Sequence, residues 1–108
     1  MAEIKVPAER LNTVIDAYLT YAKLEKGLAR NTITAYARDL ARFAEPLEGI
    51  LAAEINREHI KAFIEALERD GLSPASRARA LVAVRRLLKF MCAEQLIEKD
   101  PSQGILAP

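Results

Sequence analysis

Two stretches of this chain carry most of its positive charge, and each has the residue types that bind a polyanion. Residues 26–42 have a net charge of +3, and residues 74–90 have a net charge of +5 with no acidic residue. Residues 43–70 lie between them with a net charge of −4, so the total of +1 conceals the pattern. Clustered Lys and Arg side chains are a common means of contacting phosphate groups. The two basic stretches are therefore the first candidates for a binding site.

Other kinds of chemistry find little support in the residue types. The chain has one cysteine, Cys92, and one histidine, His59, which excludes an internal disulfide and a His/Cys metal cluster. We interpret His59 as a surface or capping residue and Cys92 as a small core residue. Tyr18 and Tyr36 lie on apolar stripes and no base accompanies Tyr21, so none of them is expected to be a nucleophile. The sequence thus predicts no catalytic residue, no metal, no cofactor and no small-molecule substrate.

Length and composition predict one folded domain. The chain has 108 residues, of which 51% are hydrophobic and 29% are charged, unlike a disordered chain. The first residues lack the apolar segment of a secretory signal, and no stretch is long and apolar enough to span a membrane. We expect a cytoplasmic protein with no membrane partner. Residues 1–108 would form a single domain, with residues 1–7 as an N-terminal tail and residues 105–108 as the start of a linker.

The spacing of apolar residues places both basic stretches on helices. Apolar side chains recur at three- and four-residue steps and predict four helices, over about residues 8–26, 30–45, 57–70 and 74–94. Gly27 and Gly71 lie where two of them end, and Asn56 and Ser73 lie where N-caps are needed. Residues 47–55 are expected to form a loop, and Asp100-Pro101 a last short turn or helix. We predict an all-α fold, a small orthogonal bundle of four main helices arranged as two helical hairpins, plus a short C-terminal helix.

The two predicted hairpins share a sequence pattern at an offset of 44 residues. Gly27-Leu28 is followed by Thr32, and Gly71-Leu72 is followed by Ser76. Two copies are too few for a solenoid, so the pattern favours paired hairpins packed against each other. A resemblance between unrelated helix–Gly–helix turns explains the pattern equally well.

The second and fourth predicted helices each present a basic face opposite their apolar stripe. At 3.6 residues per turn, these faces contain Asn31, Thr34, Ala35, Arg38 and Arg42 in one helix, and Ala75, Arg79, Val82, Arg86 and Lys89 in the other. Small residues between the arginines would let a helix backbone sit close to a DNA duplex. Thr32 and Ser76 add hydroxyl groups near helix N-termini, where free amides favour phosphate. The pattern indicates a pair of DNA-reading helices.

Two other interpretations of the charged residues remain open. Arginines on an exposed helix face often only solvate it. The acidic run of residues 54–70 is most simply a solvated face, and it could also meet a basic surface on a neighbouring protomer. The small total charge and the amphipathic first helix support a second class of function, a small helical protein–protein adaptor with no DNA role.

Several ordered segments resemble the N-terminal core-binding domain of tyrosine recombinases and phage integrases, the Xer-type recombinases most closely. They are Tyr21–Thr32 with Tyr36, Asp39-Leu40 and Phe43, then Gly71–Ser73 with Ser76–Leu87, and finally Glu94–Pro101. The match covers about residues 11–108. One departure is Ala29, because many relatives have Ser at this expected helix cap, and Asn31 and Thr32 would then have to satisfy more of the free amides.

The resemblance implies a four- to five-helix domain that forms one jaw of a clamp around a recombination half-site in double-stranded DNA. It places the second and fourth helices across the major groove, and it implies other recombinase protomers, in a tetrameric synapse, as further partners. Their candidate contacts are the first helix and the exit segment. Taken with the basic faces, the candidate DNA-binding residues are Asn31, Thr32, Thr34, Arg38, Arg42, Ser76, Arg77, Arg79 and Arg86.

The family's cleavage chemistry belongs to a C-terminal domain, with a set of arginines and histidines and a tyrosine nucleophile. The resemblance therefore implies that this chain is a fragment that binds DNA without cutting it. The parent protein would be a tyrosine recombinase.

Overall fold

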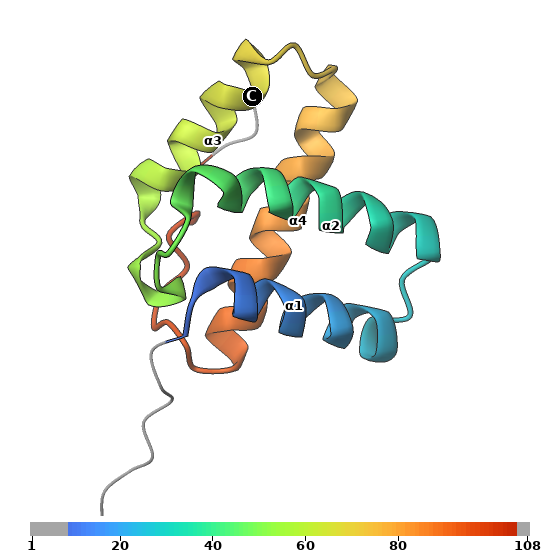
Figure 1. Cartoon of the computed structure of the whole chain (residues 1–108), viewed down its shortest axis with the longest axis vertical. Helices are drawn as coiled ribbons and strands as arrows, with labels where there is room; N and C mark the ends of the chain where they lie inside the picture. The colour runs from blue at the N-terminus through green and yellow to red at the C-terminus, as the bar shows by residue number, and fades with distance from the viewer. Residues whose placement is uncertain (1–8, 106–108) are drawn as a thin grey trace, which may run out of the picture.

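Four α-helices build the part of the chain that the computed structural model describes, residues 9–105 (Figure 1). They are α1 (Leu11–Tyr21), α2 (Arg30–Ala44), α3 (Arg57–Arg69) and α4 (Pro74–Ala93). A π-helical turn, Ala22–Lys26, extends α1. Within residues 9–105 there is no strand, so the predicted all-α class is confirmed. No helix in this part of the chain is long and apolar enough to cross a membrane.

Local signals set most helix ends. The side chain of Asn56 accepts a hydrogen bond from the His59 amide (3.1 Å), and His59 Nδ1 accepts one from the Asn56 amide (3.0 Å). Ser73 Oγ accepts the Ser76 amide at the start of α4 (3.1 Å). Gly27 and Gly71 adopt φ values of 67° and 79°, the left-handed region that suits glycine. These predicted caps and stops are confirmed.

The helices form two hairpins that pack across each other. In Figure 1, α1 and α2 run side by side in opposite directions, and α4 crosses behind both of them. The most extensive contact between helices joins α2 to α4. Leu40, Leu87 and Met91 are fully buried at the centre, and Phe43 meets the edge of Phe63 with ring centroids 5.2 Å apart. The bundle thus fixes α2 and α4, the two predicted basic helices, against each other.

The first helix starts later than predicted, at Leu11 instead of about residue 8. Arg10 has an extended backbone, because the residues on either side of it bond to the loop after α2. The Leu11 amide donates to the Ile50 carbonyl (3.0 Å), and the Ala52 amide donates to the Glu9 carbonyl (2.7 Å). That loop itself contains two short 3₁₀ turns, residues 45–47 and 52–54. The predicted tail, residues 1–7, lies outside the described residues.

The segment after α4 forms a turn at residues 101–104, and no further helix is formed up to residue 105. Asp100 accepts hydrogen bonds from the amide and the hydroxyl of Ser102, both at 2.7 Å, and these local bonds replace a helical start. The predicted short C-terminal helix is therefore corrected to a turn.

This exit turn is fastened to two helices. Arg57 of α3 donates to the Gln103 carbonyl (2.9 Å), Arg85 of α4 donates to the Ile105 carbonyl, and the Ile105 side chain is buried. Of the predicted linker at residues 105–108, only Ile105 is described.

Candidate nucleic-acid interface

The outer face of α2 carries an exposed polar stripe, as the sequence predicted. Asn31, Thr34, Arg38 and Arg42 are exposed, while Thr32 is half-buried. Among the described residues, Arg38 has no hydrogen bond or ion pair, so its guanidinium is free to move toward a ligand. Arg42 is less free, since its Nη1 lies 3.2 Å from Asp70 Oδ2 at the end of α3.

The outer face of α4 carries the second stripe. Arg86 and Lys89 are exposed, and small or short side chains lie between them and the helix start. These shorter residues are Ala75, Ala78 and Val82, all of them exposed. A helix surface of this kind combines cationic ends with a low profile, which allows close approach of a bulky ligand.

An ion pair with one buried partner joins the two stripes. Arg79 of α4 donates through Nε to Asp39 Oδ2 (2.9 Å) and through Nη2 to Asp39 Oδ1 (2.8 Å). The Asp39 side chain is 4% exposed, whereas that of Arg79 is 39% exposed. The hydrogen bonds to Asp39 raise the pKa of the Arg79 guanidinium above its ordinary value, which keeps it charged. The basic stripes of α2 and α4 therefore lie next to each other, with Arg79 at the seam.

Two predicted contact residues at the start of α4 have partners within the protein. Arg77 is half-buried and donates through Nη1 to the Leu72 carbonyl (2.7 Å). Ser76 is half-buried, and its hydroxyl accepts from the Ser73 hydroxyl (3.1 Å). Both side chains stabilise the turn before α4, while the positive end of this helix stays at the surface.

The start of α2 differs from that of α4. Ala29 occupies the cap position, and no side chain caps the first turn. Asn31 and Thr32, expected to satisfy the free amides, make no such bond. The first amides of α2 thus have no side-chain acceptor within the described part of the chain, and they are available to an anion.

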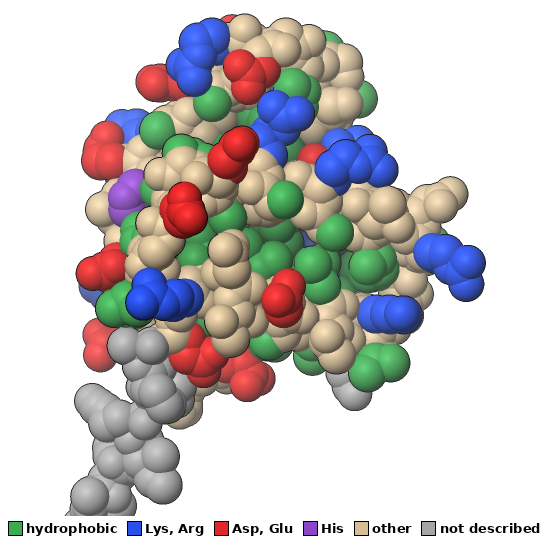
Figure 2. Space-filling model, in the orientation of Figure 1, with side chains coloured by type: hydrophobic (Ala, Val, Ile, Leu, Met, Phe, Trp, Pro, Cys, Tyr) green, Lys and Arg blue, Asp and Glu red, His purple; other side chains and the backbone are tan. Residues whose placement is uncertain are grey.

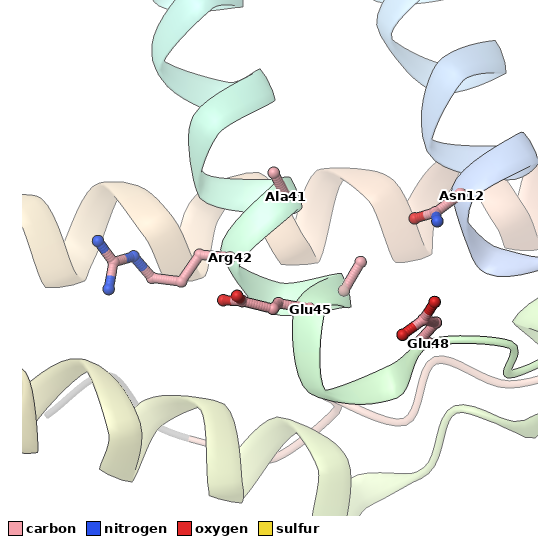
Figure 3. Close-up of a pocket in the computed structure, with 6 residues that line it drawn as sticks. Asn12, Ala41, Arg42, Glu45 and Glu48 are labelled. Atoms are coloured by element: carbon pink, nitrogen blue, oxygen red, sulfur yellow. The ribbon is translucent and has the colours of Figure 1, made fainter.

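The charges are unevenly distributed over the surface. In Figure 2, the blue side chains at the right lie over the start of α2 and the end of α1, and red side chains lie mainly to the left and below. A shallow hollow of about 540 Å³ beside the end of α2 lies between the basic and the acidic regions. Arg42 and Glu45 lie on one side of it, and Glu48 lies near Asn12 on the other (Figure 3). Its two carboxylates would repel phosphate, so the basic face ends at Arg42.

A groove of about 410 Å³ between α1 and α4 borders the α4 stripe, and sequence reasoning missed it. Tyr18 and Tyr21 line it together with Phe90, whose ring centroid lies 5.6 Å and 5.2 Å from theirs. Burial raises the pKa of the Tyr18 hydroxyl, and the nearby charge of Arg86 partly opposes this. The groove therefore has aromatic walls and a cationic edge formed by Arg86 and Lys89.

Sequence reasoning also missed the role of Asp39. Its signal was present, because Asp39 falls three residues after Tyr36 and four before Phe43, on the buried side of α2. A carboxylate at such a position needs a partner, which the sequence does not name.

Among the described residues, no group of three His, Cys, Asp or Glu side chains is placed to hold a metal ion.

Comparisons with known proteins agree with this architecture. Residues 15–95 match the family described as "Phage integrase, N-terminal SAM-like domain". The chain belongs to this family. The predicted resemblance is thereby confirmed, and the chain is a domain of the tyrosine-recombinase type.

Two similar proteins are each named tyrosine recombinase XerD. The chain is 34% identical to that of Brucella abortus biovar 1 (strain 9-941) over 101 residues, which cover 92% of this chain and 33% of the relative. It is 38% identical to that of Mycobacterium tuberculosis (strain ATCC 25618 / H37Rv) over 104 residues, 87% of this chain and 33% of the relative. The chain therefore spans about a third of the length of these relatives. No solved structure matches the chain.

Proposed function

We propose that this domain binds double-stranded DNA, with α2 and α4 in the major groove of a recombination half-site. The observation that carries the proposal is the pair of exposed basic stripes joined at the Asp39–Arg79 ion pair. The major groove admits an α-helix, and Ala75 and Ala78 keep α4 thin where it would enter. Family membership supports the same function.

The exposed residues divide into two kinds of contact. Arg38 and Arg86 have long, exposed side chains that suit phosphate groups on either side of the groove. The uncapped amides at the start of α2 and the positive end of α4 favour further phosphates. Thr34 and Asn31, exposed beside Arg38, supply shorter donors. Such contacts place the domain on the duplex, and affinity should depend on salt.

The proposal also covers protomer assembly and strand cleavage, which concern the whole parent protein. We propose that α1 and the exit turn contact neighbouring protomers in a tetrameric synapse. Strand cleavage and rejoining would be carried out by the parent recombinase outside these residues. The domain itself would bind DNA without cutting it.

A salt series on a fluorescent duplex tests DNA binding. The logarithm of the affinity should fall steeply with the logarithm of the salt concentration, with a slope of about 0.9 for each phosphate contact. Arg38→Glu with Arg86→Glu should weaken binding strongly and reduce this slope. Lys23→Glu with Lys99→Glu is the matched control, because it makes the same charge change at exposed residues outside the face.

Arg79 is left out of this test because a glutamate there would face the buried Asp39 carboxylate and destabilise the fold. Equal losses in the two double variants would contradict the assigned face. Absence of duplex binding at low salt would favour the adaptor class instead.

A further inference from the structure

The ion pair leaves one particular edge of Arg79 available. A guanidinium has five N–H groups in a rigid plane. The Nε edge, with one N–H of Nη2, is occupied by Asp39. At the far end of the guanidinium, one N–H of each Nη points away from the stem of the side chain. The Arg79 side chain is 39% exposed. Arg79 therefore presents two parallel donors in a fixed direction.

We propose that Asp39 is a positioning residue that holds Arg79 as a reader of guanine in the major groove. This inference rests on the proposed DNA-binding function and adds a base preference to it. Guanine offers the O6 and N7 acceptors side by side on its major-groove edge, and a bidentate arginine matches both.

The surroundings of Arg79 favour a base over a phosphate. Arg79 lies at the seam between α2 and α4. The residue one turn before Arg79 on α4 is Ala75, and the residue one turn before Asp39 on α2 is Ala35, so both neighbours are small. The centre of such a face meets the base edges on the floor of the groove, while its margins meet the phosphates. Because the buried Asp39 carboxylate balances its charge, Arg79 has little attraction for phosphate compared with Arg38 or Arg86.

The two arginines at the margins provide the contrast. Among the described residues, neither Arg38 nor Arg86 has an ion-pair partner, so their long side chains keep their rotational freedom. A mobile arginine can follow a phosphate but gives little selectivity among bases. Sequence preference should therefore depend on Arg79 and Asp39 much more than on the other arginines of the face.

The test begins with selection of preferred duplexes from a randomised library by the wild-type chain. A guanine on which binding depends is then replaced by 7-deazaguanine, which lacks the N7 acceptor. Wild-type affinity should fall about tenfold. Arg79→Lys keeps the charge but loses the parallel donors, so it should lose this discrimination while the salt slope stays unchanged.

Asp39→Asn should lose the same discrimination in a different way. Arg79 would be free to contact phosphate, so the salt slope should rise by about 0.9. Arg38→Lys is the matched control and should keep the guanine preference. Circular dichroism at the assay temperature checks that each variant is folded. If Asp39→Asn does not fold, Arg79→Lys, which retains an ion pair to Asp39, takes its place in the test.

Two results would overturn the inference while leaving the proposed function intact. One is a library with no guanine-dependent position, and the other is a guanine preference that survives in Asp39→Asn or in Arg79→Lys. A wild-type chain that binds no duplex would refute the proposed function itself.

Discussion

Loss of Arg79 should destabilise the domain more than loss of Asp39, because only one partner of this ion pair is buried. The Asp39 side chain is 4% exposed and that of Arg79 is 39% exposed. Arg79→Met leaves an unpaired carboxylate in the interior, which should cost about 3–5 kcal/mol. Asp39→Asn leaves a cation that water reaches, next to an amide oxygen that still accepts a hydrogen bond, and should cost about 1–3 kcal/mol.

Thermal unfolding followed by circular dichroism measures the difference. For a domain of this size, each kcal/mol lowers the midpoint by roughly 4 °C, so the expected losses are roughly 12–20 °C for Arg79→Met and 4–12 °C for Asp39→Asn. Acidification should reduce the deficit of Arg79→Met relative to the wild type. A neutral carboxylic acid is much cheaper to bury than a carboxylate, so the folded variant gains stability from binding a proton.

Two controls accompany this comparison. Arg38→Met removes an exposed arginine from the same face and should change the stability by less than about 0.5 kcal/mol. Asp39→Leu with Arg79→Met removes both charges and should recover most of the loss. The reasoning is refuted if Arg79→Met costs no more than Asp39→Asn, or if its deficit is the same at pH 7 and pH 4.

Three further predictions concern single residues. Ser73→Ala removes the oxygen that accepts the Ser76 amide and should lower the free energy of unfolding in urea by about 1 kcal/mol, so an unchanged midpoint would argue against this cap. Leu87 is fully buried, and Leu87→Ala should cost about 2–5 kcal/mol in the same assay, whereas a smaller loss would mean that the core collapses around the gap. Burial, with a smaller effect of Asp100, raises the pKa of the Cys92 thiol, so less thiolate is present at pH 8. Cys92 should therefore react with a disulfide reagent more slowly than free cysteine, at a rate that keeps rising with pH where free cysteine levels off.

The features that could be predicted from sequence were those with local causes. Apolar spacing over one or two turns placed the helices, and the Ser73 hydroxyl before Pro74 fixed the start of α4. Gly27 and Gly71 ended helices because the backbone there turns into the left-handed region. The exposed faces of α2 and α4 followed from the same spacing, since the side opposite a buried stripe faces solvent.

The features that were missed depend on contacts between distant residues. Glu9 and Arg10 leave the helical pattern because a loop some 40 residues later bonds to them. Asp39 meets Arg79 across 40 residues of sequence, and helical spacing says nothing about such a pair. The bond from Arg77 to the Leu72 carbonyl is local in sequence, and it was missed because it depends on the conformation of the turn before α4, which helical spacing does not describe. Helical spacing could therefore predict which face is exposed, but it could not predict the partner of each arginine on that face.

The fastening of the exit turn to α3 and α4 has a mechanical consequence. Arg57 and Arg85 donate hydrogen bonds to the carbonyls of Gln103 and Ile105, and the Ile105 side chain is buried. Tension applied to the backbone at Ile105 would be transmitted to α4 without a slack tether in between. The direction of the chain at Ile105 and the orientation of α4 are therefore mechanically coupled.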